Sequence, residues 1–205
     1  MGRGVKAPPP ITAAYLERAT SWYLERNHTT TAHLKRLLMQ RVTTSLAMHG
    51  GDKAEFIELV DAEIARLVRI GLMDDAAYAR DKAKSLHRRG TSAAKIKAAL
   101  GAKGLNQEQT KAAVVTLQDD GDADPEFTAA VAFARKRRLG QWRLRDVDAD
   151  GARKELAKLG RAGFSYGIAR RDDRIADDRQ RKSRVDEQLD QESSSRTSST
   201  RRAMP

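Results

Sequence analysis

The sequence of 205 residues contains no cysteine, which excludes disulfide bonds, thiolate zinc sites and cysteine nucleophiles. Aromatic residues make up only 5% of the chain, so it can bury a core but not one rich in rings. No apolar run approaches the roughly 18 to 20 residues of a membrane-spanning helix. The first residues, "MGRGVKAPPPITAAYL", lack the apolar run of a secretory signal. We therefore expect a soluble cytoplasmic protein that does not contact a membrane.

The usual signatures of catalysis are also missing. The glycines form neither a phosphate-binding loop nor a dinucleotide fingerprint after a strand. The four histidines are scattered, and none has a partner at the spacing of a zinc-binding helix. No serine lies in the strand-to-helix elbow that activates a nucleophile. We predict no catalytic residues, no cofactor and no metal, and therefore a protein that is not an enzyme.

Apolar residues recur at helical spacing along most of the chain, whereas no segment alternates like a strand, so the sequence predicts an all-α fold. Tyr15, Ala19 and Trp22, with Leu16 and Tyr23 alongside, predict the apolar face of a first helix over residues 11–26. A second helix follows the possible caps Thr29, Thr30 and Thr31, and a third ends at Gly71. Their expected apolar faces consist of Leu34, Leu37 and Leu38, and of Phe56, Val60, Ile64 and Leu67.

Capping residues predict where the later helices begin. Ser92 and Asn106 are expected N-caps, with Gln109 completing a capping box after Asn106. Asp124 is the expected N-cap of a helix that has Pro125 at its first position. Gly90 and Gly104 are expected helix stops. The expected buried faces consist of Ala76, Ala79, Ala83 and Leu86, and of Phe127, Ala130, Val131 and Ala134.

The adjacent acids Asp74 and Asp75 stand at the start of a predicted helix. Neighbouring helical residues point about 100° apart, so the two carboxylates cannot easily share one metal or water. A carboxylate at a helix start accepts hydrogen bonds from N–H groups that lack partners. We interpret the pair as a structural corner.

Three segments of the chain resemble one another. "AHLKRLLMQRV", "AAKIKAALGAKGL" and "ARKELAKLGRAGF" align on Leu38, Leu100 and Leu159. This recurrence predicts tandem helical repeats, none of which could bury its apolar face alone. The expected boundaries are a flexible segment 1–10, repeats 11–73, 74–122 and 123–172, and a charged Ser/Thr-rich tail 173–205 that is disordered or a fraying helix.

The formal net charge is +11, and most of the excess lies before the tail. Between residues 80 and 103 only Asp81 is acidic, whereas a solvated helix face usually interleaves both signs. This imbalance favours a polyanion or an acidic groove as partner over a bland surface. Aromatic residues do not interleave with the charges, so base stacking is not expected. The candidate contacts are Arg80, Lys84, Arg88, Arg89, Lys95, Lys97, Lys103, Arg135, Lys136, Arg137, Arg138 and Arg143.

Two stretches together resemble the RecX family. "GLMDDAAYARDKAKSLHRRGTSAAKIKAALGAKGL" is similar to the family's signature, and "FARKRRLG" with "KLGRAGFSYGIARR" is similar to its last repeat. The resemblance covers about residues 12–171. It implies three repeats of three helices in an elongated, curved, basic body. It also implies a cytoplasmic protein, expected to be monomeric, that binds the RecA recombinase filament on single-stranded DNA and mostly inhibits it.

The sequence departs from the family pattern at two places, and two other functions remain open. "HTTTAH" replaces the usual corner of the first repeat, and charged residues follow Ile168 where a final apolar helix is expected. The last helix is therefore expected to dock poorly or project outward. One alternative is a helix-turn-helix protein that inserts "TSAAKIKAALGAKG" into the major groove of duplex DNA. An enzyme is the remaining alternative.

Overall fold

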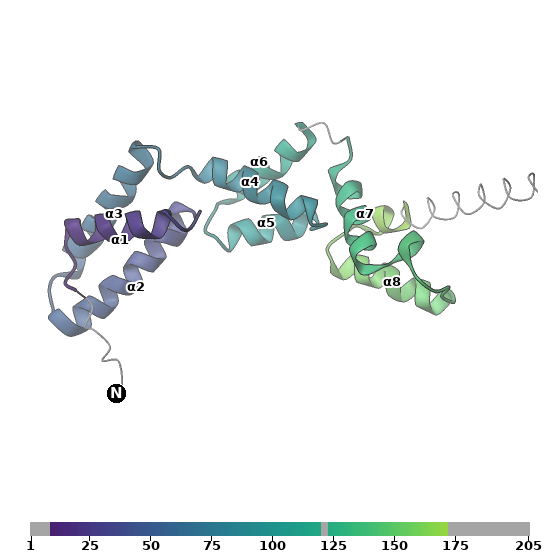
Figure 1. The fold of residues 1–205 in the computed structure, drawn as a ribbon, viewed down its shortest axis with the longest axis horizontal. Coiled ribbons are helices and arrows are strands. Elements are labelled where there is room, and N and C mark those ends of the chain that lie inside the picture. Colours follow the sequence, from purple (N-terminus) through teal and green to yellow (C-terminus); the bar gives the residue numbers. More distant parts are fainter. Residues whose placement is uncertain (1–8, 120–122, 172–205) are drawn as a thin grey trace, which may run out of the picture. The chain divides into compact units, whose positions relative to one another are not determined.

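A computed structural model describes residues 9–119 and 123–171, and every regular element among them is helical, which confirms the all-α prediction (Figure 1). Residues 166–171 are also helical. The predicted C-terminal tail and almost all of the predicted flexible N-terminal segment lie outside the described residues. The elements are α1 (Ala13–Leu24), α2 (Thr31–His49), α3 (Lys53–Arg69), α4 (Asp75–Arg88), α5 (Ala93–Gly101), α6 (Gln107–Asp119), α7 (Pro125–Arg137), the 3-10 helix η1 (Gly140–Trp142) and α8 (Ala149–Arg161).

The helices divide into two compact units. Unit 1 contains α1, α2 and α3, α4 up to Ser85, and the chain from Ile96 through α6. Unit 2 contains the segment Leu86–Lys95, which ends α4 and begins α5, together with α7, η1, α8 and residues 166–171. Along the chain, α1 to α3 are followed by α4 to α6 and then by α7, η1, α8 and residues 166–171, and the expected repeat boundaries stay a prediction.

The first helix of unit 1 buries a face that differs in part from the one that the sequence predicted. Leu16 and Thr20 of α1 are fully buried, and Tyr15 and Tyr23 pack against the same core. Trp22 is 56% exposed, so the prediction is wrong for Trp22 and missed Thr20. A threonine could enter the core because α3 supplies a hydrogen-bond partner for its hydroxyl.

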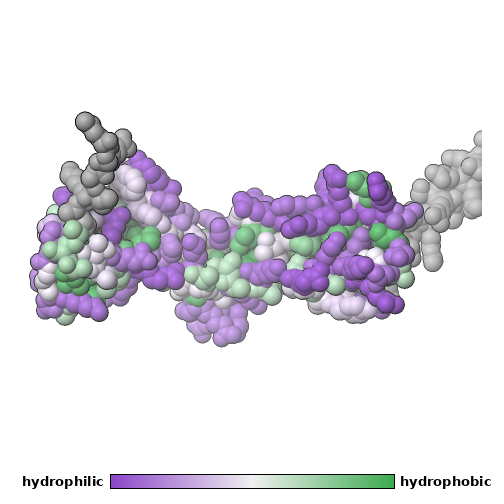
Figure 2. All heavy atoms as spheres, turned by 90° about the horizontal axis from the view of Figure 1, so that it is seen from below, coloured by the Kyte–Doolittle hydropathy of each residue, from purple (hydrophilic) through white to green (hydrophobic). Residues whose placement is uncertain are grey.

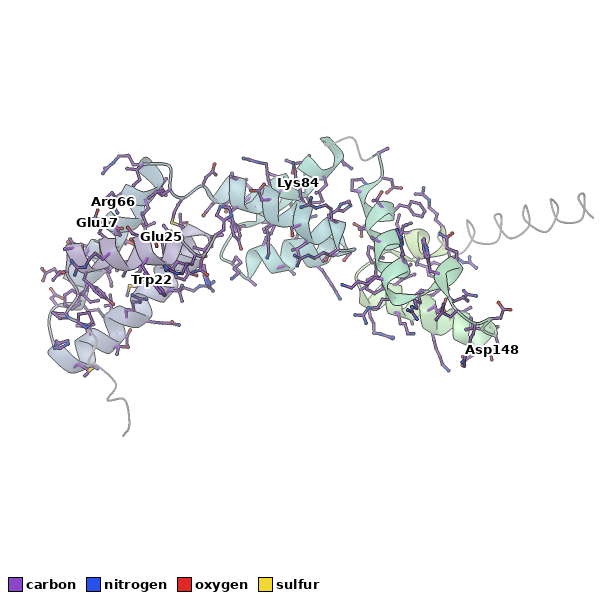
Figure 3. All side chains as sticks on the ribbon, viewed as in Figure 1. Glu17, Trp22, Glu25, Arg66, Lys84 and Asp148 are labelled. Atoms are coloured by element: carbon purple, nitrogen blue, oxygen red, sulfur yellow. The ribbon has the colours of Figure 1, made fainter. Side chains whose placement is uncertain are left out.

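That partner is Glu63, a carboxylate that is only 7% exposed. Thr20 Oγ1 donates to Glu63 Oε1 at 2.6 Å, and Arg66 Nε donates to Glu63 Oε2 at 2.8 Å. Burial by itself raises the pKa of Glu63, but the hydrogen bonds from Arg66 and Thr20 outweigh it and lower that pKa overall. Arg66 also lies 3.6 Å from Glu17, so this network joins α1 to α3 (Figure 3).

The core of unit 1 otherwise follows the sequence. Leu34 and Leu38 of α2 are buried with Val60 and Leu67 of α3, while Leu37, Phe56 and Ile64 are half-buried. On α4, Ala79 and Ala83 are buried as predicted, but Ala76 is exposed. The buried face of α4 begins instead at Tyr78, whose ring packs edge-on against His28 at 5.4 Å.

The start of α2 is held by residues from α4 and from the turn after α5. Thr30, the N-cap of α2, donates its hydroxyl to the carbonyl of Lys103 at 2.5 Å. The carboxylate of Asp75 accepts the Thr31 amide at 2.8 Å and the Thr31 hydroxyl at 2.7 Å. At Gly104, φ is +91° and an added Cβ would overlap Ala32, so only glycine fits this close approach.

The start of α5 is held in the same way within unit 2. The hydroxyl of Ser92 donates to the carbonyl of Ala162 at 2.8 Å, and Glu126 accepts the Ala93 amide at 3.0 Å. Gly163 also has φ +91°, and a Cβ there would lie 2.5 Å from the Ser92 hydroxyl. We call this arrangement the repeat joint: a hydroxyl and an N–H at one helix start, bound by a carbonyl and an acid from the following repeat.

The two acids of "GLMDD" therefore have separate structural roles, as the sequence predicted for a corner. Asp74 caps α4 by accepting the amides of Ala76 and Ala77, both at 2.9 Å. Hydrogen bonds from the Ala77 and Ala76 amides lower the pKa of Asp74. Asp75 reaches Thr31 and completes the repeat joint of unit 1.

The other predicted caps are also confirmed. Asn106 and Gln109 exchange backbone-to-side-chain hydrogen bonds at 2.8 and 2.9 Å, which is the reciprocal pattern of a capping box. Asp124 accepts the Phe127 amide at 3.2 Å, and Pro125 begins α7. These signals are local, so sequence spacing identifies them correctly.

Unit 2 has a small-residue core whose α7 face differs in part from the prediction. Ala129, Ala130 and Ala134 are fully buried, whereas Phe127 and Val131 are only half-buried. The guanidinium of Arg171 lies 4.6 Å from the centre of the Phe127 ring, so this ring packs beneath an arginine near the surface. The stripe of alanines lets neighbouring helices approach closely.

The final helical segment docks onto this core, contrary to the expectation of poor docking for the residues that are described. Ala169 is 2% exposed, and Ile168 packs with the same cluster of apolar residues. Arg171 pairs with Asp124, and this contact lowers the pKa of the Asp124 carboxyl. Arg171 is thus accommodated at the surface of this core because it contacts both an acid and an aromatic ring.

Replacing Gly104 with alanine is expected to destabilise the protein by about 2 to 4 kcal/mol, the combined cost of a left-handed backbone and overpacking. Gly101, the last residue of α5, provides the control, because it has helical backbone and no atom within 4 Å of an added Cβ. Gly101→Ala should be neutral or stabilise by up to about 1 kcal/mol. Urea unfolding measures both, and equal losses would contradict the close approach at Gly104.

Candidate polyanion-binding surface

The longest cationic stripe lies on α4. Arg80, Lys84 and Arg88 follow one another at four-residue spacing, which places them on one side of a helix. Arg80 and Arg88 are exposed, and Lys84, labelled on α4 in Figure 3, is half-buried. The cap at Asp74 and the buried alanines of α4 position the stripe. Arg89 follows the helix and is also exposed.

The short helix α5 adds two exposed lysines, Lys95 and Lys97. In unit 2, Lys95 lies beside the turn after α8, because a Cβ added at Gly163 would be 3.6 Å from Lys95 Cγ. Lys95 is therefore placed by the same repeat joint that holds Ser92. In unit 1, Lys103 is half-buried at the turn after α5.

A cluster of basic groups surrounds Lys103. Arg36 Nη2 donates to the carbonyl of Ala102 at 3.0 Å and lies 3.3 Å from His33 Nδ1. A guanidinium cannot accept a hydrogen bond, so this contact requires Nδ1 of His33 to act as the acceptor. Burial, Lys103 and Arg36 lower the pKa of His33, in that order of importance. The sequence pattern did not indicate His33 or Arg36, because α2 carries them 66 or more residues before the turn that they approach.

Unit 2 carries the second concentration of positive charge at the end of α7. Arg135, Lys136, Arg137 and Arg138 are all exposed. Arg138 ends the helix in a left-handed conformation with φ 56°, and the guanidinium of Arg137 lies 5.8 Å from the Phe133 ring centre. This run therefore places exposed positive charge at the terminus of a helix.

Arg143 has a different environment from the other candidates. Its Nη2 donates to Glu155 Oε2 at 3.0 Å, and the same carboxylate oxygen accepts the amide of Gly140 at 2.9 Å. Arg143 thus helps to hold η1 against α8. Of the twelve predicted contacts, it is the one most clearly engaged in the fold.

The exposed basic residues can attract anions through their charge. Hydrophilic residues cover most of the face seen in Figure 2, with apolar atoms in smaller patches. Among the described residues no group of three histidines, cysteines or acids could hold a metal ion. Within the same residues, no helix is both long and apolar enough to cross a membrane.

Comparisons with known proteins agree with one another. A family model described as the second three-helix domain of RecX matches residues 74–114. The Regulatory protein RecX of Myxococcus xanthus (strain DK1622) is 41% identical over 173 residues, which cover 82% of this chain and 89% of that protein. That of Mycobacterium ulcerans (strain Agy99) is 32% identical over 168 residues, or 80% and 89% of the two chains.

A solved structure is also similar in fold. It is described as the crystal structure of regulatory protein RecX, and it aligns with a TM-score of 0.54 and 18% sequence identity. The alignment covers 76% of this chain and 68% of that chain. At this level of identity the likeness supports the helical fold alone.

The lowered pKa of His33 predicts a pH dependence of stability. Below the ordinary histidine pKa near 6.5, the unfolded chain binds a proton more readily than the folded chain, so unfolding becomes easier as pH falls. His33→Gln should remove this part of the pH dependence. Urea unfolding between pH 7.5 and 5.5 measures the pH dependence of the free energy of unfolding. His49→Gln is the control, because His49 is exposed in the last turn of the same helix. An unchanged slope in His33→Gln would show that the cluster does not disfavour the imidazolium.

Proposed function

The chain belongs to the RecX family of regulatory proteins, and from this premise we propose that it binds the RecA recombinase filament on single-stranded DNA and mostly inhibits its activity in recombination and repair. We propose that it does so as a monomer in the cytoplasm. The observation that carries the proposal is the cationic stripe Arg80, Lys84 and Arg88 with Lys95 and Lys97, in a stretch that has Asp81 as its only acid.

Such a surface is complementary to a linear polyanion such as the phosphate backbone of DNA. Each lysine or arginine that neutralises a phosphate releases a counterion, which makes binding strong at low salt and independent of base sequence. Acidic patches on a recombinase would be attracted by the same field. A filament on DNA offers both, so the proposed partner matches the charge without requiring base readout.

The chemistry of the described surface also favours regulation over catalysis. The one buried carboxylate of unit 1, among the residues that the structure describes, is Glu63, and Thr20 and Arg66 hold it inside the core. Asp74 and Asp75 accept hydrogen bonds at helix starts. These acids stabilise the fold, and we infer that the protein acts by occupying a surface of its partner.

The helix-turn-helix alternative is disfavoured by the surroundings of α5. A recognition helix reads base edges with residues near its N-terminus. Here Ser92 and Ala93, at the start of α5, are bonded to the carbonyl of Ala162 and the carboxylate of Glu126. Ser92 and Ala93 are thus engaged within unit 2 and are not free to enter the major groove. The helix is also short, at nine residues.

Reversing the charge of the α4 stripe should weaken inhibition. We expect Arg80→Glu, Lys84→Glu and Arg88→Glu together to raise the concentration needed for half-inhibition of DNA-dependent ATP hydrolysis by RecA at least tenfold. The salt dependence of binding should flatten by about one counterion for each phosphate that the variant no longer neutralises. Steady-state ATPase assays at several salt concentrations measure both effects.

The matched control reverses three exposed cations outside the candidate set, Lys53, Lys111 and Arg153. It changes the net charge by the same amount, so it should retain most of the inhibition if position matters. If both triple variants lost inhibition equally, the loss would be explained by net charge alone and not by the position of the α4 stripe. If the wild-type protein left RecA activity unchanged at every ratio, the proposed function would be wrong.

A further inference from the structure

Two aromatic side chains, Trp22 and Tyr166, are exposed on the described surface, and each carries an arginine over its ring. Trp22 is 56% exposed, and the Arg26 guanidinium lies 4.7 Å from its ring centre. Tyr166 is 64% exposed, and the Arg170 guanidinium lies 5.3 Å from its ring centre. Every other Phe, Tyr or Trp in residues 9–119 and 123–171 is buried or half-buried. An exposed ring with an arginine four residues later thus occurs once in each unit, whereas Phe133, which has Arg137 at the same spacing in unit 2, is half-buried.

The Arg26 side chain is held in place on the indole. Its Nη1 donates to the carbonyl of Trp22 and to Glu25 Oε2, both at 3.2 Å. Figure 3 shows Trp22 and Glu25 on and beside α1. Both bonds use one nitrogen, and within the described residues no acceptor bonds to Nε or Nη2. The guanidinium is therefore ordered while most of its donors remain available.

The fold does not explain why these rings are aromatic. The buried face of α1 is formed by Leu16 and Thr20, so the indole of Trp22 contributes no core packing there. In residues 166–171 the apolar contacts come from Ile168 and Ala169, and Ser165 accepts the Ile168 amide to begin the turn. A polar side chain at either position would satisfy the helix equally well.

We propose that Trp22 and Tyr166 are stacking sites for the bases of single-stranded nucleic acid, and that Arg26 and Arg170 contact the adjoining phosphates. An aromatic face binds any base in a sequence-tolerant manner, and arginine supplies both a planar surface and charge. The guanidinium already on each ring disfavours a cationic ligand and favours one that joins a flat ring to an anion. This inference rests on the proposed function, to which it adds direct contact with the DNA bases.

This proposal differs from the sequence-based prediction that base stacking is not expected. That expectation concerned aromatic residues within runs of basic residues, and neither Trp22 nor Tyr166 lies in such a run. On a helix, however, residues four apart are neighbours. Arg26 and Arg170 therefore lie on rings from which three intervening residues separate them in the sequence.

Trp22 can be observed directly by fluorescence. Trp142→Phe leaves Trp22 as the single indole, because the chain has two tryptophans. Oligodeoxythymidylate should quench this emission to saturation, whereas an abasic oligomer of the same length and charge should bind with little quenching. Equal quenching by both oligomers would mean that only phosphates are contacted and would overturn the proposal.

Binding of a labelled oligodeoxythymidylate provides a second readout in the otherwise unaltered protein. Trp22→Ala should weaken binding by about five- to 150-fold, the range for one stacked base. Tyr166→Ala should have a separate effect in the same range. Leu144→Ala, which removes another exposed apolar side chain, should bind as the wild type does. Unchanged binding in both ring variants would overturn the proposal.

The outcomes separate this inference from the proposed function. If RecA quenches Trp22 but oligodeoxythymidylate alone does not, the ring is an anchor for protein and the stacking proposal fails. If oligodeoxythymidylate quenches Trp22 while RecA activity is unaffected by the protein, the stacking proposal stands and the proposed function fails.

Discussion

The N–H groups at the start of a helix have no partner within that helix, and this protein satisfies them with groups from the following repeat. Thr31 donates to Asp75 in unit 1, and Ala93 donates to Glu126 in unit 2. A buried N–H without an acceptor would cost about 1 to 3 kcal/mol, so each acid fixes where the next repeat begins. The glycine after each turn allows the carbonyl before it to approach the capping hydroxyl. The position of each helix start, the conformation of the turn that contacts it and the glycine in that turn therefore all depend on the repeat joint.

The proposed binding surface is consistent with the same constraint. Because Ser92 and Ala93 at the start of α5 are bonded within unit 2, the basic side chains that this part of the chain offers to a partner are those of the α4 stripe and the exposed Lys95 and Lys97. Basic side chains on helices contact phosphates well but read base edges poorly without entering a groove. The fold thus favours a partner recognised by its charge. Under the stacking proposal, exposed rings with an arginine, such as Trp22 with Arg26, would add contacts to unpaired bases without adding sequence preference.

The features predicted correctly from the sequence are those whose partners lie within one helical turn. Asn106 with Gln109, and Asp124 with the Phe127 amide, could be identified from spacing alone. The errors involve partners far apart in the sequence. Thr20 is buried where Trp22 was predicted because its hydroxyl bonds to Glu63. Glu63 lies 43 residues later, so nothing in the sequence near α1 indicates this contact.

In the candidate site, too, the sequence predicted the arrangement of residues within one helix but not the contacts between helices. Spacing placed Arg80, Lys84 and Arg88 on one side of a helix. It could not show that Arg143 is held by Glu155, or that His33 approaches Lys103, because those contacts depend on how helices pack. Asp75 was recognised as part of a corner, but its partner Thr31 lies 44 residues earlier.

Amide hydrogen exchange tests the repeat joint most directly. First-turn amides normally exchange quickly, because they lack a partner within the helix. The account predicts that the amides of Thr31 and Ala93 are protected as strongly as those inside α2 and α5. It also predicts that Asp75→Ala exposes Thr31 while Ala93 stays protected. Rapid exchange of both amides in the wild-type protein would contradict the claim that acids from the following repeat hold these helix starts.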